Sequence, residues 1–294
     1  MLHRWVEACY IQIGKSQINT FKYIISGGII MKVKIIGVSG SPRKGNTNIL
    51  VKECLKAAET LKDVETEFIH LADFKIEGGC KACLRCYAEP NSEKFCWAYD
   101  DEMKLVLKQL MEGDGFIFGS PVYWGSWTAQ FKTFVDRTHP FVGLGKLLRN
   151  KPAGAVTVAL GSIAGQEHVI SEIIRFIMFH DMIPIGVDVI WPMEGMASPW
   201  GVTGRQGFPD NMGSLTPGNL KAVNQDKAAM ACAKVLGIRV AEMAKVVKAG
   251  FTLVNPKNEE TKWPAGPLTA EFQAEDHHTV AYVKKNIRDK EANA

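Results

Sequence analysis

The chain has 294 residues, 46% of them apolar, and a formal net charge of +4 at neutral pH. A chain of this size buries a full core in one large domain or two, and it contains no unbroken apolar run long enough to span a bilayer. The charges are nearly balanced and form no polybasic block, so we expect neither nucleic acid nor a membrane as a partner.

Residues 1–30 carry only weak periodicity, and a clean strand pattern begins at Met31. Polar and charged residues interrupt any signal-peptide core in this stretch, and no cleavage pattern follows it. We therefore expect an N-terminal extension over 1–30, with Met31 as the natural start. Cys9, Cys54 and Cys232 are scattered rather than paired, which indicates a reducing interior and predicts a cytoplasmic location.

A short apolar run at 33–38 predicts a parallel strand that is covered on both faces. It leads into a polar, glycine-rich loop over 39–48, and helical periodicity begins near Asn46. Strand, loop and helix in this order aim backbone N–H groups and the positive end of a helix at an anion. The loop adds hydroxyl donors and flexible glycines, which are Ser39, Gly40, Ser41, Gly45 and Thr47.

This loop matches neither a Walker sequence nor the Gly-x-Gly-x-x-Gly pattern, so a phosphate monoester fits it better than a pyrophosphate. The alternative is an ordinary turn between strand and helix, capped by serine and asparagine. The number of donors within ten residues favours the phosphate.

Four of the seven cysteines follow a second predicted strand at 66–71. Cys80, Cys83 and Cys86 are spaced three residues apart, and the nine residues Tyr87–Phe95 separate them from Cys96. Four thiolates, three of them from a tight run, are typical ligands of an iron–sulfur cubane. Zinc, which usually takes two separated cysteine pairs, and redox-active or unligated thiols are the alternatives, whereas disulfides fit this spacing poorly.

A helix opened by Asp100–Glu102 precedes a third buried strand at 115–119. That strand delivers the next segment to the carboxyl edge of the sheet, where open α/β sheets bind ligands. The segment is rich in aromatic residues, namely Tyr123, Trp124 and Trp127. They offer flat surfaces to a planar ring system, and the alternative is hydrophobic packing or a subunit contact.

A fourth strand at 153–160 ends in a glycine-containing loop, and a helix at 167–180 leads to a fifth strand at 183–190. His168 and His180 are expected on the helix surface or at its cap. We then expect a long loop at 191–219 of the kind that forms lids or partner surfaces, a closing helix at 226–248, and an irregular tail at 251–294. These elements predict an α/β fold with a five-stranded parallel sheet, in one domain over residues 31–250.

Over about residues 31–250 the sequence resembles the iron–sulfur flavoproteins of anaerobic microbes, within the flavodoxin-like NAD(P)H-dependent FMN reductase superfamily. The resemblance rests on the loop 39–47, on the segment 120–125, and on the four cysteines followed by Asp100, Asp101 and Met103. It implies a flavodoxin-like doubly wound sheet with a cluster loop at 78–100. The spacer before Cys96 is longer than family members usually have.

The resemblance also implies the cofactors FMN and a [4Fe–4S] cluster. The first loop would hold the FMN phosphate through Ser39, Ser41, Arg43, Gly45, Asn46 and Thr47. The isoalloxazine and ribityl chain would lie along Ser120, Pro121, Val122, Tyr123, Trp124 and Gly125, and the flavin site would be completed by Gly161 and Gly165. The cluster would be bound by Cys80, Cys83, Cys86 and Cys96. No side chain is expected to act as a catalytic acid or base.

The predicted function is an FMN-dependent oxidoreductase that couples two-electron carriers, NAD(P)H among them, to one-electron carriers such as ferredoxin. Lys81, Arg85 and Lys94 would offset the negative charge of the cluster and raise its potential. Family members assemble as dimers or tetramers, so we expect a homodimer or homotetramer. The alternatives are an FMN-dependent reductase of quinones, flavins or nitro compounds without a cluster, and a non-enzymatic module ordered by zinc.

Overall fold

The computed structural model of the protein describes residues 31–161, 164–187, 198–205 and 222–254. By its contacts the chain divides into Met1–Lys32 and Val33–Ala294, and the fold described below belongs to the second unit. The extension expected at 1–30 and residues 255–294 of the expected tail lie outside the described residues.

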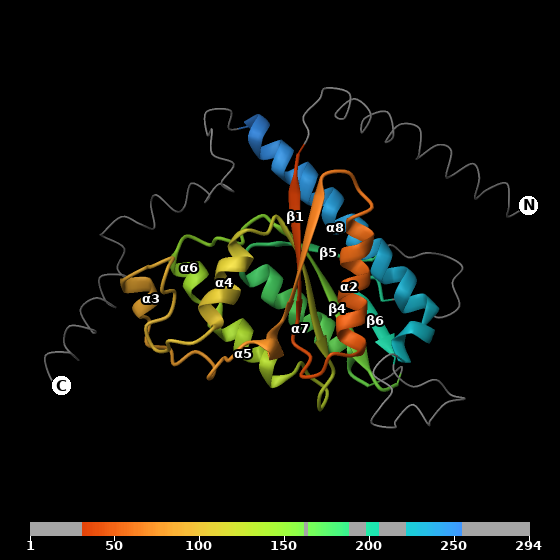
Figure 1. Ribbon diagram of the computed structural model, residues 1–294, viewed down its shortest axis with the longest axis horizontal. Helices are drawn as coiled ribbons and strands as arrows, with labels where there is room; N and C mark the ends of the chain where they lie inside the picture. The colour runs from red at the N-terminus through yellow and green to blue at the C-terminus, as the bar shows by residue number, and fades with distance from the viewer. Residues whose placement is uncertain (1–30, 162–163, 188–197, 206–221, 255–294) are drawn as a thin grey trace, which may run out of the picture. The chain divides into compact units, whose positions relative to one another are not determined.

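A parallel sheet with the strand order β2-β1-β3-β4-β5 forms the centre of the second unit (Figure 1). Its strands are β1 (Val33–Ser39), β2 (Val64–His70), β3 (Gly115–Pro121), β4 (Pro152–Ala159) and β5 (Ile183–Ile185). This is the order of a flavodoxin-like doubly wound sheet, with the switch point between β1 and β3. The predicted fold class is confirmed.

The two central strands β3 and β4 are buried at every residue, as expected for parallel strands that are covered on both faces. The edge strand β2 is only partly buried. Because β3 extends two residues past its predicted end at Gly119, Ser120 and Pro121 belong to the strand rather than to the loop after it.

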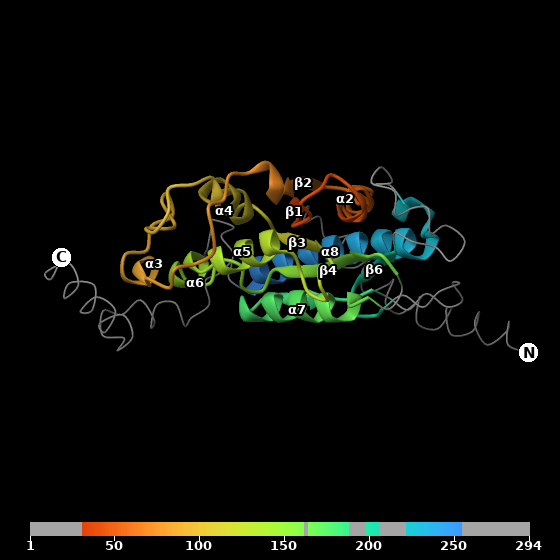
Figure 2. The ribbon, with the colours of Figure 1, turned by 90° about the horizontal axis from the view of Figure 1, so that it is seen from below.

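Helices cover both faces of the sheet and bury two separate apolar clusters. The helices are α2 (Asn46–Ala58), α4 (Met103–Met111), α5 (Ala129–Arg137), α7 (Gln166–Phe179) and α8 (Lys227–Val254), with the short α3 (Arg85–Ala88) and α6 (Pro140–Gly143). One cluster contains residues of α2 and α8, and the other contains residues of α4, α5 and α7. Figure 2 shows α2 and α7 on opposite sides of the sheet.

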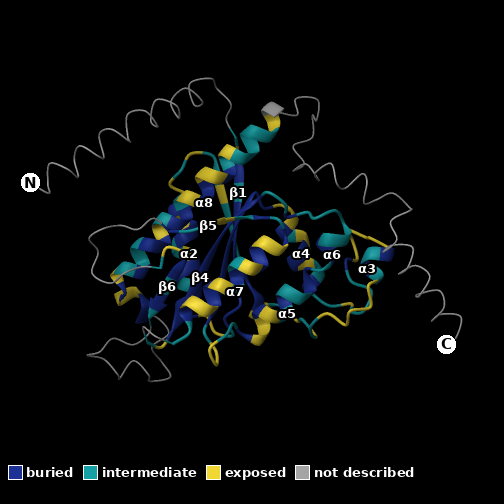
Figure 3. Ribbon diagram, turned by 180° about the vertical axis from the view of Figure 1, so that it is seen from behind, coloured by how far each residue is buried: buried dark blue, intermediate teal, exposed yellow. Residues whose placement is uncertain are grey.

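The central strands are buried, and the exposed residues lie on the outer surfaces of the helices and in the loops (Figure 3). In the described part of the chain, no helix combines the length and the apolar character that crossing a bilayer requires.

A sixth strand, β6 (Val202–Arg205), corrects the prediction of one continuous loop at 191–219. It pairs with Val156–Ala159 of β4, whereas β5 pairs only with Pro152–Gly154. The two short strands therefore lie end to end along the same edge of β4. Without β6, the carboxyl half of β4 would be an unpaired edge, which explains why a segment with little strand pattern forms a strand.

Two other predicted boundaries differ from the structure. β5 ends at Ile185 rather than at Ile190, and residues 188–190 lie outside the described residues. α8 continues past its predicted end at Lys248 and through Gly250 to Val254, so the first residues of the expected irregular tail are helical.

α2 and α8 pack closely at Gly237, where an added Cβ would lie 1.9 Å from the carbonyl oxygen of Cys54. Gly237→Ala therefore forces the helices apart, and we expect it to lower the free energy of unfolding by about 3 kcal/mol. The control is Gly250→Ala in the same helix, where a Cβ meets nothing within 4 Å. It should stabilise the protein by about 0.5 to 1 kcal/mol. Urea unfolding measures both changes, and equal stabilities would contradict the close packing.

Candidate functional site

The loop between β1 and α2 presents the amino end of a helix to the carboxyl edge of the sheet. α2 begins at Asn46 without a side-chain cap and has no acidic residue in its first turn. Its first backbone N–H groups are therefore available to an anion. At Gly40 an added Cβ would lie 2.5 Å from Phe131, so the loop packs against α5 with no room for a side chain. These features fit the phosphate that the sequence predicts.

Most polar side chains of this loop are buried and bonded within the protein. The Ser39 hydroxyl donates to Asn48 Oδ1 (2.6 Å), and the Ser41 hydroxyl donates to the Arg43 carbonyl (2.8 Å). Asn46 Oδ1 accepts the backbone N–H of Val223 at 3.0 Å. These side chains therefore fix the shape of the loop, which leaves its backbone N–H groups as the candidates for binding an anion.

The charged residues of the loop differ in their surroundings. Lys44 Nζ lies 2.8 Å from Asp73 Oδ1, and this contact lowers the pKa of Asp73. Arg43 is exposed beside it. His70, at the end of β2, places Nε2 2.7 Å from the Ser41 carbonyl and connects the loop to the neighbouring strand. Arg43 is therefore the better candidate for neutralising a phosphate.

The segment after β3 forms a tight hairpin. Tyr123 and Ser126 exchange both backbone hydrogen bonds around Trp124 and Gly125, whose φ angles are 51° and 79°. Two positive φ angles are typical of a type I′ turn. The Trp124 side chain is fully exposed at the tip. Glu172 of α7 holds the hairpin in place, because its carboxylate accepts a hydrogen bond from the Ser126 hydroxyl at 2.9 Å.

The structure brings the three predicted flavin loops to one edge of the sheet. Thr128 joins the first two, because its hydroxyl donates to the Gly40 carbonyl (2.6 Å) and its N–H donates to Ser120 Oγ (3.0 Å). At Gly165, with φ of 93°, a Cβ would lie 3.1 Å from the Gly125 Cα, so the loop after β4 meets the hairpin. Five predicted residues of this edge remain. Three are buried and one is half-buried: Gly45, Thr47 and Pro121, and then Val122. The fifth is Gly161, whose carbonyl accepts a hydrogen bond from the Gln166 side chain.

The four predicted cluster ligands are free cysteines in one irregular segment near α3 and α6 (Figure 1). Cys80 and Cys83 are exposed, Cys86 is buried and Cys96 is half-buried. Burial, together with the charges of the other three thiols, raises the pKa of Cys86 to about 12. The four sulfurs therefore lie within electrostatic reach of one another, and full deprotonation requires a bound cation.

Among the described residues, no three His, Cys, Asp or Glu side chains converge closely enough to hold a single metal ion. A zinc ion needs all of its ligands in one coordination sphere. In a cubane, each of the four thiolates binds a different iron. Four free cysteines in one segment are a donor set that fits an iron–sulfur cluster.

A buried ion pair anchors the cysteine segment to α5. Arg137 donates to both carboxylate oxygens of Asp101, at 2.8 and 2.9 Å, and to the Gly78 carbonyl at 2.9 Å. The side chains of Arg137 and Asp101 are only 2% and 3% exposed. Burial by itself would raise the pKa of Asp101, but the bonds from Arg137 and from the N–H groups of Glu77 and Met103 hold it below its ordinary value.

The cations that were predicted to offset a cluster are stacked on aromatic rings of the same segment. Lys81 lies 4.4 Å from the ring centre of Tyr99, and Lys94 lies 4.2 Å from that of Trp97. Arg85 packs against the same Trp97 ring at 5.0 Å. Cation–π contacts of this kind hold the three positive charges within the cysteine segment.

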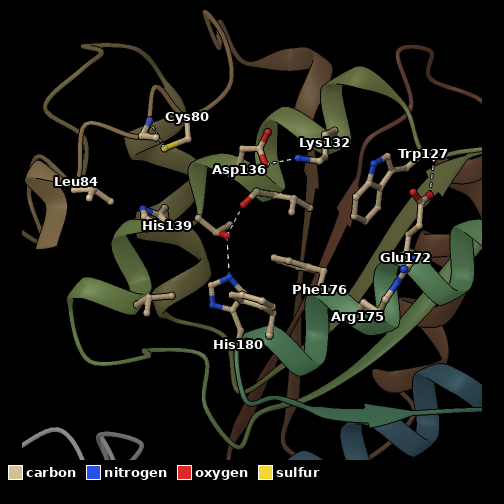
Figure 4. A pocket seen from close by; sticks show the side chains of 15 residues that line it. Cys80, Leu84, Trp127, Lys132, Asp136, His139, Glu172, Arg175, Phe176 and His180 are labelled. Carbon is tan, nitrogen blue, oxygen red and sulfur yellow. Dashed lines mark hydrogen bonds and ion pairs between the residues drawn. The ribbon is translucent and has the colours of Figure 1, made fainter. Parts of the chain in front are cut away.

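A cavity of about 560 Å³ lies between the cysteine segment, α5 and α7 (Figure 4). Cys80 and His139 line one end, and Trp127 and Glu172 line the other. Its volume is that of a small-molecule pocket. Within one chain it therefore connects the cysteine segment with the hairpin that follows β3.

The two histidines that were expected on the surface or at the cap of a helix differ from each other. His168 is exposed and lies 3.5 Å from Glu172. His180, the C-cap residue of α7, is 4% exposed, with Nε2 2.9 Å from the Thr138 hydroxyl. Burial lowers the pKa of His180 to about 4, so it is neutral at physiological pH.

Comparison with known proteins decides the family. Residues 33–194 match the NADPH-dependent FMN reductase family. Over 217 residues the chain is 39% identical to an iron–sulfur flavoprotein of Methanocaldococcus jannaschii, an alignment that covers 74% of this chain and 100% of the relative. The chain belongs to the iron–sulfur flavoproteins.

Two further relatives carry the same name. An iron–sulfur flavoprotein of Archaeoglobus fulgidus is 28% identical over 217 residues, which cover 74% of this chain and 98% of the relative. The iron–sulfur flavoprotein of Methanosarcina thermophila is 33% identical over 155 residues, 52% of this chain and 78% of the relative. The predicted family is confirmed, and the protein is a flavoprotein oxidoreductase.

The solved structure of RosB with bound 8-demethyl-8-formylriboflavin-5′-phosphate has a TM-score of 0.50 to this iron–sulfur flavoprotein at 15% sequence identity. The alignment covers 83% of this chain and 89% of RosB. At this identity the likeness bears on the fold alone, and it agrees with the strand order of the sheet.

Sequence reasoning missed the residues that support the site from other elements, namely Thr128, Arg137, His139 and Glu172. Their long-range partners, Gly40, Asp101, Cys86 and Ser126, lie 88, 36, 53 and 46 residues away along the chain, respectively. The cysteine motif includes Asp101, but no local sequence pattern identifies Arg137 as its partner. Only the packing of α5, α6 and α7 brings these residues to the site.

Asp101→Asn should leave the buried Arg137 without a counter-ion and lower the free energy of unfolding by about 3 to 5 kcal/mol. The control is Asp100→Asn, because the Asp100 side chain is 88% exposed and its ion pair with Lys104 is open to solvent; it should change the stability little. Urea unfolding at neutral pH separates the two variants.

Because folding lowers the Asp101 pKa, the contribution of this residue is complete above its ordinary value of 3.8 and is lost as the pH falls through the lower folded value. Similar losses of unfolding free energy in Asp101→Asn and Asp100→Asn would show that the ion pair does not anchor the segment.

Proposed function

We propose that this iron–sulfur flavoprotein transfers electrons between two-electron and one-electron carriers, using FMN and a [4Fe–4S] cluster. The observation that carries the proposal is that one domain combines an uncapped helix start at the sheet edge with four neighbouring free cysteines. FMN exchanges electrons in pairs or singly and the cluster exchanges them singly, so together they link the two kinds of carrier.

The chain's own residues bind and orient the flavin. The N–H groups at the start of α2 and the Arg43 guanidinium would hold the phosphate. The hairpin of Tyr123–Ser126 and the loop at Gly165 would border the ring system. Thr128 and Glu172 would keep these loops in place, since both bond the loops directly.

The cysteine segment would bind the cluster through Cys80, Cys83, Cys86 and Cys96. Lys81, Arg85 and Lys94 add positive charge, which favours the reduced, more negative form of the cluster. No described residue is required to move a proton, so the protein acts through binding, geometry and charge.

The expected partners follow from this chemistry. NAD(P)H is the proposed two-electron donor, and a ferredoxin or another small electron carrier is the proposed one-electron partner. A homodimer or homotetramer is proposed as the assembly, in line with the exposed Trp124 at the hairpin tip.

Anaerobically purified protein should contain about four iron and four sulfide atoms per chain, together with one FMN. Cys80→Ala should remove the cluster absorbance and keep the flavin. Cys232→Ala is the matched control: it removes a buried cysteine of α8, outside the cluster segment, and should keep both cofactors. Iron, sulfide and flavin analysis with visible spectra measures the outcome. Flavin without iron after careful reconstitution would instead support the FMN-dependent reductase without a cluster.

Arg43→Gln should weaken the binding of FMN by about tenfold or more, because a hydrogen bond to a charged group contributes about 1.5 to 3 kcal/mol. The affinity for riboflavin, which lacks the phosphate, should not change. Lys44→Gln serves as the control and should have a smaller effect, because Lys44 is paired with Asp73. Fluorescence titration of the flavin-free protein gives both affinities. Equal losses for FMN and riboflavin would argue against a phosphate at this loop.

A further inference from the structure

A histidine from outside the cysteine segment reaches one of its thiols. His139 Nδ1 lies 3.7 Å from Cys86 Sγ, and His139 Nε2 lies 3.3 Å from the Tyr87 hydroxyl. The His139 and Tyr87 rings meet edge to face, with their centres 4.8 Å apart. Cys86 and His139 are 53 residues apart along the chain, so tertiary packing creates the contact.

The packing of two short helices fixes this geometry. His139 directly precedes α6, which packs against α3, the helix that contains Cys86. At Gly143 of α6 an added Cβ would lie 2.5 Å from the Cys86 carbonyl oxygen, so the two backbones touch. Phe141 of α6 meets Phe95 of the cysteine segment edge to face, and both are buried. The imidazole is therefore held at the thiol by a packed core and not by a mobile surface loop.

The chemistry of a ligand thiolate decides which ring nitrogen must carry the proton. A thiolate has no proton and can only accept, so a hydrogen bond between His139 and Cys86 requires an N–H on Nδ1, and the Tyr87 hydroxyl can then donate to Nε2. A neutral imidazole carries one N–H, so the proton is on Nδ1, the nitrogen that faces Cys86. An N–H directed at a sulfur is a donor to a thiolate.

We propose that His139 donates its Nδ1–H to the Cys86 thiolate of the cluster and thereby raises the reduction potential of the cluster. This inference rests on the proposed function, because it requires a cluster at the four cysteines. Hydrogen bonds to ligand sulfurs raise the potential, since the reduced cluster carries more negative charge and gains more from the donor. His139 is thus a positioning and tuning residue and not a ligand.

Three variants test the proposal in the anaerobically purified, cluster-loaded protein. His139→Phe keeps a ring and removes the donor, and it should lower the midpoint potential of the cluster. His139→Asn carries an amide N–H near the position of Nδ1 and should restore most of the potential. His139→Gln carries its N–H further out, near Nε2, and should resemble the phenylalanine variant.

Potentiometric titration followed by EPR gives the potential, and resonance Raman spectroscopy should show a higher Fe–S(Cys) stretching frequency in the phenylalanine variant. Iron per chain and the flavin potential should match the unsubstituted protein.

Loaded variants whose potential and Raman spectrum are unchanged would refute the inference and leave the proposed function intact. Loss of iron in both the phenylalanine and asparagine variants would also refute it, because His139 would then hold the cluster in place and not tune it. A complete absence of iron from the unsubstituted protein would refute the proposed function itself, and this inference with it.

Discussion

The ion pair between Arg137 and Asp101 is the interaction on which the position of the cysteine segment depends. Within residues 78–101 only the four-residue α3 is regular structure, and most side chains are exposed, so apolar packing alone holds the segment weakly. Arg137 bonds the Gly78 carbonyl before the cysteines and the Asp101 carboxylate after them. One buried side chain therefore closes the whole segment into a loop whose two ends are fixed to α5.

Closing this loop lowers the entropic cost of gathering four thiols on one cofactor, because the ends of the chain are already together. The long spacer before Cys96 is compatible with this arrangement, since extra residues in a closed surface loop add little to the entropic cost of bringing the thiols together. Burying the two charges is costly, but the pair is bidentate and Asp101 accepts two further N–H bonds, which offsets the loss of water. Phe95, buried against Phe141, fixes the far side of the loop.

The sequence predicted those parts of the molecule that depend on local pattern. The apolar runs of β1, β3 and β4 identified the sheet, and the cysteine spacing identified the candidate ligands. β6 was not predicted because its four residues have little strand pattern. It pairs with the part of β4 that the short β5 leaves unpaired, which the sequence does not reveal. Arg137, His139 and Glu172 were not predicted for a related reason: their roles come from contacts between helices that are distant in sequence.

The meeting of Gly125 and Gly165 has a consequence for how the two loops can move. At Gly165 a Cβ would lie 3.1 Å from the Gly125 Cα and 3.3 Å from Val122 Cγ1, so no side chain fits between the loop before α7 and the hairpin after β3. The hydrogen bond from the Ser126 hydroxyl to Glu172 holds the hairpin to α7 as well. A displacement of either loop therefore displaces the other, and the two form one mechanical unit at the edge of the sheet.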